Sequence, residues 1–205
     1  MKDPIDLWTL QNELSGGLSP VCGVDEAGRG PLAGPVCAAA VILPPGLVIE
    51  GLNDSKKLSE KKRGALYERI VSEAVSYGIA FAGVEEIEQT DILSAALLAM
   101  NRAIAQLDPQ PALALVDGNT TRNIAVSARS VIGGDGKCAS IAAASILAKV
   151  TRDRFMVEMA EKYPQYGFEK HKGYGTKAHY AALEAFGPCE IHRLSFLRKF
   201  YAGGR

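Results

Sequence analysis

The sequence lacks an apolar run long enough to cross a membrane, and its 205 residues carry no net charge. A membrane span needs about 18 consecutive apolar residues, and every apolar stretch here is shorter. Residues 1–6 lack the basic start and apolar stretch of a signal peptide, so we expect none. With 47% hydrophobic and 22% charged residues, the composition predicts one globular domain with a sizeable core.

Cysteine is scarce and is not spaced for metal binding. The four cysteines lie at positions 22, 37, 138 and 189, and no two of them form a Cys-x-x-Cys pair. They stand among apolar or small residues. This pattern predicts reduced thiols in a cytoplasmic protein and argues against a zinc site.

The neutral total hides an uneven distribution of charge. Residues 1–148 carry 12 Lys and Arg against 17 Asp and Glu, whereas residues 149–205 carry 11 against 6 and hold all three histidines. An acidic part joined to a basic part suits an enzyme that holds cations and a polyanion together. Chance variation over a short segment explains the same numbers, so charge alone does not decide between the two interpretations.

Apolar periodicity predicts interleaved strands and helices. Strands are expected at 20–25, 35–43, 78–84, 112–116 and 126–132. Helices are expected at 59–76, 90–107, 140–163, 177–186 and 195–201. Ser59 and Thr90 are the expected N-caps, and Asp108-Pro109 the expected end of the second helix. The short gap between the first two strands indicates a hairpin, so we expect an α/β fold with a mixed sheet and helices on both faces.

Two adjacent carboxylates stand where the first apolar run stops. Asp25 and Glu26 are followed by three glycines and two prolines within residues 28–35. A strand sends neighbouring side chains to opposite faces, so this pair alone cannot complete a metal site. Glycines let backbone N–H groups approach an anion closely. The stretch therefore indicates either a metal-bound phosphate or a strand end with a charged turn.

Two glycine-rich stretches resemble nucleotide-binding loops, but the residues around them do not fit either motif. Residues 28–33 match G-x-G-x-x-A, but Pro35 and the β-rich run after it leave no room for the helix that a Rossmann fingerprint opens. Gly136-Lys137 has Val131 where a P-loop needs glycine and Cys138 where it needs serine or threonine. A nucleotide-binding oxidoreductase or kinase is therefore disfavoured.

Acid recurs at the ends of three apolar runs. Asp117 follows residues 112–116, and Asp135 follows residues 126–132, as Asp25 follows the first run. Carboxylates that converge repel one another unless divalent cations neutralise them, and hard oxygen ligands favour magnesium or manganese over zinc. Two such ions about 3.5–4 Å apart can activate a water and stabilise a leaving oxygen in phosphodiester cleavage. Taken singly, each Asp is better explained as a capping or turn residue.

Seven motifs follow one another along the chain: GVDEAGRGPLAGPV at 23–36, NDSKKLS at 53–59, VDG at 116–118, GDGK at 134–137, SIAAASILAKVTRD at 140–153, HKGYGT at 171–176 and HRLSF at 192–196. In these motifs, and in the spacing and flanks of its acids, the chain resembles ribonuclease HII, the type 2 RNase H family, over residues 20–197. The sister family, ribonuclease HIII, usually has Asp-Glu-Ser-Gly-Lys-Gly in the first motif and an extra N-terminal domain. This chain has Ala27 and Arg29 there.

The resemblance implies an RNase H-like mixed sheet flanked by helices, with a small C-terminal helical part. Residues 1–19 would be a lead-in, 20–163 the catalytic domain, and 164–205 a basic helical segment packed on the same domain. The implied enzyme is a metal-dependent endoribonuclease that hydrolyses the RNA strand of RNA–DNA hybrids. It would also incise 5′ to single ribonucleotides in duplex DNA, as in ribonucleotide excision repair and DNA replication, leaving 3′-OH and 5′-phosphate ends. A cytoplasmic monomer without a membrane partner is expected.

The resemblance also implies the site residues. Four catalytic carboxylates would hold two Mg²⁺ or Mn²⁺ ions: Asp25, Glu26, Asp117 and Asp135. The substrate-binding residues would be Gly28, Arg29, Gly30, Lys56, Lys57, Lys172 and Tyr174. The glycine-rich backbone would read the 2′-OH that separates RNA from DNA, the tyrosine ring would pack on a neighbouring sugar, and the lysines would hold phosphates. Two simpler interpretations remain open: each lysine could be a plain solvated charge, and the tyrosine could pack within its own loop.

Two alternatives accompany this hypothesis. One is a hybrid nuclease of the ribonuclease HIII type. The other is a catalytically silent protein that binds RNA–DNA hybrids, which would have lost a carboxylate, and all four are present. Among the remaining residues, His192 and Arg193 are expected to anchor the C-terminal segment, whereas Lys149 and Arg152 are helix residues whose exposure the sequence leaves open.

Overall fold

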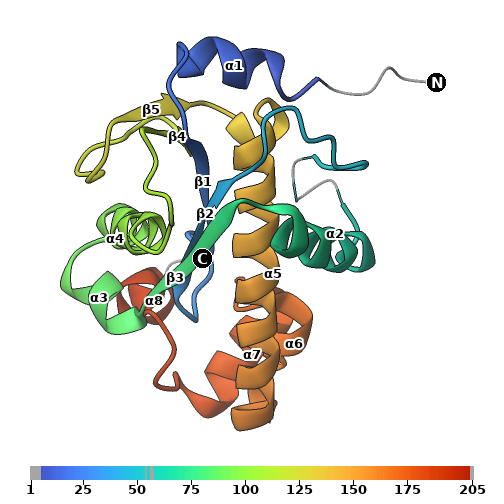
Figure 1. Cartoon of the computed structure of the whole chain (residues 1–205). Coiled ribbons are helices and arrows are strands. Elements are labelled where there is room, and N and C mark those ends of the chain that lie inside the picture. Colours follow the sequence, from blue (N-terminus) through green and yellow to red (C-terminus); the bar gives the residue numbers. More distant parts are fainter. Residues whose placement is uncertain (1–5, 54, 56–57, 204–205) are drawn as a thin grey trace.

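The computed structural model describes residues 6–53, 55 and 58–203. A five-stranded sheet forms its centre, in the order β3-β2-β1-β4-β5 (Figure 1). The strands are β1 (Val21–Ala27), β2 (Val36–Ile42), β3 (Ser76–Ala82), β4 (Leu113–Asp117) and β5 (Ala128–Val131). β2 pairs antiparallel with β1 and β3, whereas β4 pairs parallel with β1 and β5. The expected mixed sheet is confirmed.

Helices cover both faces of this sheet. They are α1 (Thr9–Ser15), α2 (Glu60–Glu73), α3 (Val84–Gln89), α4 (Ile92–Ile104), α5 (Ala139–Lys162), α6 (Phe168–His171), α7 (Lys177–Phe186) and α8 (Leu194–Tyr201). α5 and α2 lie on one face and α4 on the other (Figure 1). The lower half of α5 extends beyond the sheet, where it contacts α6 and shares an apolar cluster with α7. No helix in the described part of the chain is both long and apolar enough to cross a bilayer.

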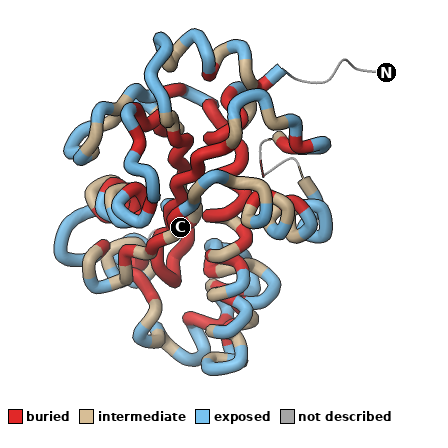
Figure 2. The backbone as a smooth tube through the Cα atoms, viewed as in Figure 1, coloured by how far each residue is buried: buried red, intermediate tan, exposed pale blue. Residues whose placement is uncertain are grey.

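Small apolar residues let β2 lie between the two helical layers. All seven of its residues are buried, in the region where the tube of Figure 2 is red. Ala38 and Ala40 pack in the apolar cluster that includes α4, whereas Ala39 packs in the cluster that includes α5. This alternation follows from the two-residue period of a strand. Because the alanine side chains are short, a helix can approach each face closely.

Helix α5 meets the central strand at the level of the backbone. A Cβ atom on Gly23 would lie 2.1 Å from the carbonyl carbon of Ser140 and 2.2 Å from the amide nitrogen of Ile141. No side chain fits in that space, so glycine is required where the two elements touch. The contact fixes α5 directly against β1, the strand that carries the first acidic motif.

The first strand is longer than the sequence predicts. It continues through Asp25 and Glu26 to Ala27, because these residues pair with β2 in the register Asp25↔Ala39 and Glu26↔Ala38. The two carboxylates therefore project from a strand and not from the turn after it.

The helix over 92–104 also begins and ends differently from the prediction. Asp91, not Thr90, is its N-cap, because the Asp91 Oδ1 atom accepts hydrogen bonds from two backbone N–H groups at 2.8 and 3.0 Å. Thr90 instead ends α3, a short helix that the sequence pattern did not predict. α4 ends at Ile104, before Asp108-Pro109, and a turn then carries Leu107 into the core.

Candidate active site

Three predicted acids meet at one edge of the sheet. β1 and β4 are parallel and in the register Val24↔Val116, so Asp25 and Asp117 follow side by side. A 3-10 turn shortly after β5, Gly134–Gly136, delivers Asp135 to the same edge. One carboxylate oxygen from each of these three residues lies within 4.8 Å of the others. Asp25 and Asp135 are 5% and 7% exposed, and Asp117 is half-buried.

Hydrogen bonds hold these carboxylates in place. The N–H of Gly134 donates to Asp117 Oδ1 at 2.7 Å, which ties the end of β4 to the turn that carries Asp135. Asp25 Oδ1 accepts the N–H of Glu26 at 2.7 Å. Ser145, from α5, also bonds to the Asp25 carboxylate and lies 2.8 Å, Oγ to Oγ, from Ser55.

The electrostatics of this cluster suit a divalent cation. Burial raises the pKa of the Asp25 carboxyl well above its usual value, and the negative charges of Glu26 and Asp117 raise it further. Only hydrogen bonds from Glu26 N–H and Ser145 act in the opposite direction. Crowded, buried oxygen ligands without nitrogen or sulfur favour hard ions of the magnesium, manganese or calcium type. The donor set therefore fits the metal that the acid pattern predicts.

Glu26 stands next to this group and not within it. Neighbouring residues of a strand point to opposite faces, and the cluster found among the described residues comprises the three aspartates. The Glu26 Oε1 atom lies 3.4 Å from Arg29 Nη1, and its charge acts on Asp25. The structure thus brings three of the four predicted ligands together and leaves the fourth at their border.

A cleft of about 190 Å³ opens beside Asp25, and four of the predicted substrate-binding residues line it: Gly28, Arg29, Gly30 and Tyr174. Its lining comprises Asp25, Glu26, Ala27, Gly28, Arg29, Gly30, Ser55, Ser145, Lys149 and Tyr174. Tyr174 is 44% exposed, so it is not fully packed inside its own loop. A Cβ atom on Gly30 would lie 3.6 Å from Tyr174 Cε1, which puts the ring directly over this glycine.

Four cleft residues were not predicted as site residues: Ala27, Ser55, Ser145 and Lys149. The i, i+4 spacing of Ser145 and Lys149 puts both on one face of α5, a signal that the sequence contained. Lys149 Nζ donates to Asp153 Oδ1 at 2.6 Å, so its charge is partly offset.

Of the three predicted phosphate-binding lysines, Lys172 is described by the structure and is not among the cleft-lining residues. Lys56 and Lys57 lie outside the described residues. Lys172 is half-buried in a left-handed backbone conformation (φ 51°), and its Nζ donates to the carbonyl of Glu169.

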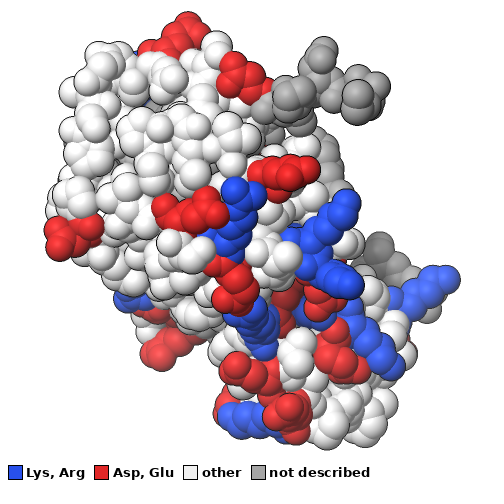
Figure 3. Space-filling view, turned by 45° about the vertical axis from the view of Figure 1, so that its right-hand side comes forward, with Lys and Arg blue, Asp and Glu red and all other residues white. Residues whose placement is uncertain are grey.

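The positive excess of residues 149–205 is largely engaged within the protein. Arg154 pairs with Glu68 at 3.0 Å, and Lys162 pairs with Glu190. Arg152 and Arg193 are fully buried. On the face seen in Figure 3, Lys and Arg lie interspersed with Asp and Glu. Fewer basic groups are therefore available to a duplex than the charge count indicates.

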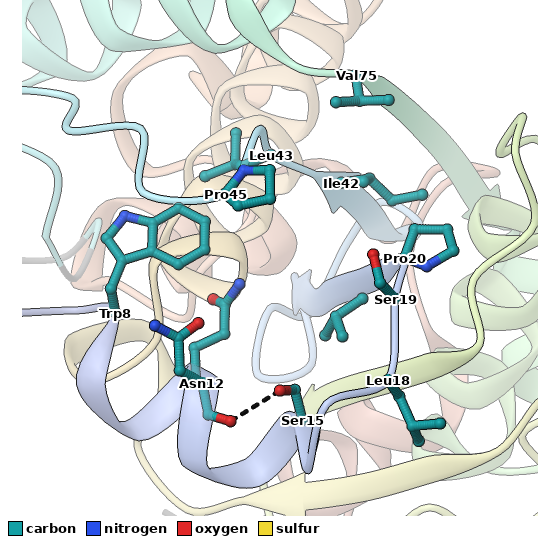
Figure 4. A pocket seen from close by; sticks show the side chains of 12 residues that line it. Trp8, Asn12, Ser15, Leu18, Ser19, Pro20, Ile42, Leu43, Pro45 and Val75 are labelled. Atoms are coloured by element: carbon teal, nitrogen blue, oxygen red, sulfur yellow. Dashed lines mark hydrogen bonds between the residues drawn. The ribbon is translucent and has the colours of Figure 1, made fainter.

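A second hollow, of about 310 Å³, lies at the other end of β1 (Figure 4). It is lined by α1, by Val21 at the start of β1 and by Ile42 at the end of β2. None of the described residues that line it is acidic or basic, and its polar groups include Ser15, whose Oγ donates to the carbonyl of Asn12 at 2.7 Å. In the described part of the chain, this hollow therefore offers neither a carboxylate to a cation nor a basic group to a phosphate.

Comparison with known proteins identifies the family of this chain. A family model described as Ribonuclease HII matches residues 22–199. This chain belongs to the ribonuclease HII family. It is 58% identical over 176 residues to ribonuclease HII of Burkholderia lata, and the aligned residues cover 86% of this chain and 82% of that protein. It is 54% identical over 185 residues to the enzyme of Caldicellulosiruptor bescii, which covers 90% of each.

The fold comparison agrees with this assignment. The crystal structure of ribonuclease H2 from Pyrococcus horikoshii superposes with a TM-score of 0.73 at 25% identity, over 89% of this chain and 97% of that one. The RNase H-like fold is thereby confirmed. As a ribonuclease HII, the protein is a divalent-metal-dependent endoribonuclease that acts on RNA–DNA hybrids. The expected family and class of activity are confirmed, in preference to the ribonuclease HIII and silent-binder alternatives.

Proposed function

We propose that this ribonuclease HII also incises duplex DNA on the 5′ side of a single embedded ribonucleotide, and that its products end in 3′-OH and 5′-phosphate. The observation that carries the proposal is the composition of one cleft, in which Asp25 is joined by the Gly28–Gly30 loop and the Tyr174 ring. Acids that suit a metal and elements that suit a single sugar thus share one cavity.

Four carboxylates are assigned to two Mg²⁺ or Mn²⁺ ions: Asp25, Glu26, Asp117 and Asp135. The all-oxygen donor set and the mutual proximity of the three aspartates support this assignment. Glu26 is included because its charge acts on Asp25. Bound divalent ions supply an activated water and stabilise the leaving oxygen. The protein's own part is to orient the ligands, through Gly134 N–H on Asp117 and Ser145 on Asp25.

The sugar is assigned to the surface between the glycine loop and the tyrosine. Gly28 and Gly30 carry no side chain, so backbone groups at Gly28, Arg29 and Gly30 can approach a ribose 2′-OH. The exposed Tyr174 ring lies over Gly30 and can pack against the adjacent sugar. This contact would fix the position of the strand relative to the acids.

Phosphates along the duplex are assigned to Lys56, Lys57 and Lys172, and Lys149 adds a positive charge within the cleft itself. Salt-dependent affinity is the expected consequence, because phosphate contacts release counterions. We further propose a cytoplasmic location, which the four free cysteines support.

The test uses end-labelled duplexes that contain one ribonucleotide, a run of ribonucleotides or none, each with magnesium, with manganese and with a chelator. We expect a single cut 5′ to the lone ribonucleotide, cuts within the run, no cut in all-DNA, and no activity with the chelator. Asp117→Asn should lower the cleavage rate by on the order of 1,000-fold, and Asp108→Asn, an exposed acid outside the site, should not. Cleavage of the run alone would refute the proposal.

A further inference from the structure

The carbonyl groups of the glycine loop converge on one buried side chain, Arg193. Its Nη2 donates to the carbonyl of Gly28 at 2.6 Å, and its Nη1 donates to those of Arg29 and Pro31 at 3.1 and 2.9 Å. Its Nε donates to the carbonyl of Gly34 at 2.8 Å. One guanidinium from the last motif of the chain therefore holds the whole turn between β1 and β2.

Arg193 is an unusual residue to bury. It is 0% exposed, and its hydrogen-bond partners in the described structure are backbone carbonyls. Desolvation, followed by the charge of Arg152, lowers its pKa to about 9. A buried cation is costly unless its donors are satisfied, and the planar fork of arginine can satisfy several acceptors at once. A purely apolar anchor would fill the space without this cost and would leave the carbonyls unpaired.

The direction of these carbonyls fixes the direction of the neighbouring amides. The peptide bonds between Gly28, Arg29 and Gly30 are trans, since the cis bonds of the described chain lie at Ser19-Pro20 and Asp108-Pro109. In a trans peptide the C=O and the following N–H point in opposite directions. Because the Gly28 and Arg29 carbonyls point at Arg193, the N–H groups of Arg29 and Gly30 point away from it. Arg193 is fully buried and is not among the residues that line the cleft, whereas Arg29 and Gly30 are.

A second buried arginine braces the rest of this turn. Arg152 donates to the carbonyls of Pro35, Ala33 and Lys172 at 2.9, 3.0 and 3.0 Å. A Cβ atom on Gly28, whose φ is +104°, would lie 2.1 Å from Arg152 Nε. Arg152 thus packs under the turn and joins it to the loop before Tyr174, whereas Arg193 holds the carbonyls of the Gly28-Arg29 segment.

We propose that Arg193 is a positioning residue for sugar recognition: it aims the backbone N–H groups of Arg29 and Gly30 into the cleft and thereby sets the preference for a ribonucleotide over a deoxyribonucleotide. This inference rests on the proposed function of the cleft. Arg193 touches neither the substrate nor the acids, and it acts through the backbone that it holds.

The test compares Arg193→Lys and Arg193→Gln with the wild type and with Arg198→Lys, a control at an exposed position of α8, the helix that follows Arg193. Lysine keeps the charge but loses the fork, and glutamine keeps a donor without burying a charge. Three quantities are measured: the single-turnover cleavage rate, the affinity ratio for duplexes with one ribonucleotide or its deoxy counterpart in metal-free buffer, and amide hydrogen exchange over residues 28–35.

We expect both Arg193 variants to lower the cleavage rate by about 100-fold, the loss that a misplacement of about 1 Å produces. The ribo-to-deoxy affinity ratio should fall toward one while the affinity for all-DNA duplex stays unchanged, and exchange over 28–35 should accelerate. Arg198→Lys should match the wild type in all three. A merely structural role would lower both affinities together and leave their ratio unchanged.

The outcomes separate this proposal from the proposed function. A wild-type affinity ratio together with a wild-type cleavage rate in either folded variant would overturn the role of Arg193. A failure of both variants to fold would overturn it too, because Arg193 would then be a residue of the core alone. If instead the wild type cuts hybrids but not a lone ribonucleotide, the proposed function fails. In that case, amide exchange over 28–35 still reports whether Arg193 orders the loop, and unchanged exchange would refute it.

Discussion

The Nε2 atom of His179 lies 3.0 Å from the Nε2 atom of His192, and the contacts on either side determine which ring carries the proton between them. His192 Nδ1 accepts the N–H of Cys189 at 2.9 Å, so the proton of His192 is on Nε2 and is donated to His179. His179 therefore carries its own proton on Nδ1, which donates to the carbonyl of Tyr174 at 3.0 Å. Both rings must be neutral for this chain of hydrogen bonds to form.

This histidine pair predicts a loss of stability in acid. Burial lowers the pKa of both His179 and His192 to about 4, from an ordinary value of about 6.5. Between these values the unfolded chain binds more protons than the folded one, so the stabilisation is complete above about pH 6.5 and is lost as the pH falls toward 4. The loss should be on the order of a few kcal/mol. Urea unfolding at several pH values measures it.

The matched variant for this measurement is His192→Gln, which should unfold with a flatter pH dependence than the wild type. Comparing the two proteins cancels the carboxylates, including Asp25, whose raised pKa makes a contribution of opposite sign. If the free energy of unfolding changes with pH equally in both proteins between pH 4 and 6.5, the buried pair does not titrate as described.

Divalent ions should raise the melting temperature. The three clustered aspartates repel one another without a cation, and an ion that binds the folded state alone stabilises it by mass action. We expect the melting temperature to rise with millimolar magnesium or manganese, and the rise to shrink in Asp117→Asn. The Asn side chain can still accept the Gly134 N–H, so this variant should fold. An equal rise in Asp117→Asn and the wild type would argue against binding at the shared carboxylates.

Removing the Tyr174 ring should impair cleavage more than binding. Its exposed position over Gly30 suits contact with a sugar, and a displacement of the strand by about 1 Å can lower the rate by about 100-fold. Tyr174→Ala should therefore cut a single-ribonucleotide duplex about 100-fold more slowly with little change in affinity. Tyr174→Phe, which keeps the ring, should be milder. Single-turnover rates beside equilibrium binding make the comparison, and wild-type cleavage by Tyr174→Ala would remove the ring from the mechanism.

Gly23→Ala should destabilise the fold, because its Cβ atom would lie 2.1 Å from the backbone of α5. Overpacking of this kind costs about 1–3 kcal/mol or more. Gly64→Ala is the matched control. Gly64 lies in α2 with no atom within 4 Å of its added Cβ, so the same substitution should stabilise by about 0.5–1 kcal/mol. Thermal or urea unfolding measures both, and a stable Gly23→Ala protein would contradict the close contact.

The acidic edge could be predicted from the sequence because its causes are local. An apolar run that ends in Asp, as at Asp117, indicates the end of a buried strand, and the carboxyl ends of parallel strands share an edge. The position of Glu26 beside the aspartates also follows from the two-residue period of a strand. The family motifs then supplied the roles that spacing alone left open.

The two buried arginines could not be predicted in the same way. Arg193 does anchor the C-terminal segment, as expected, but the carbonyls to which it bonds lie 159 to 165 residues earlier in the chain, and nothing in its own segment indicates those partners. Arginine is normally solvated, and the sequence left the exposure of Arg152 open. The sequence therefore shows the excess of basic residues near the C-terminus. Which of these residues are buried depends on tertiary contacts.

The glycine contact between β1 and α5 also determines how the enzyme can meet its substrate. The strand carries Asp25, and the helix carries Ser145 and Lys149, so two walls of the cleft belong to one rigid block without a hinge. Such a block cannot close around a double helix. The shape change in the encounter is then expected in the nucleic acid, whose bending cost varies with base sequence. Base pairs that flank the ribonucleotide, although none of them is read directly, would in this way influence how fast it is cut.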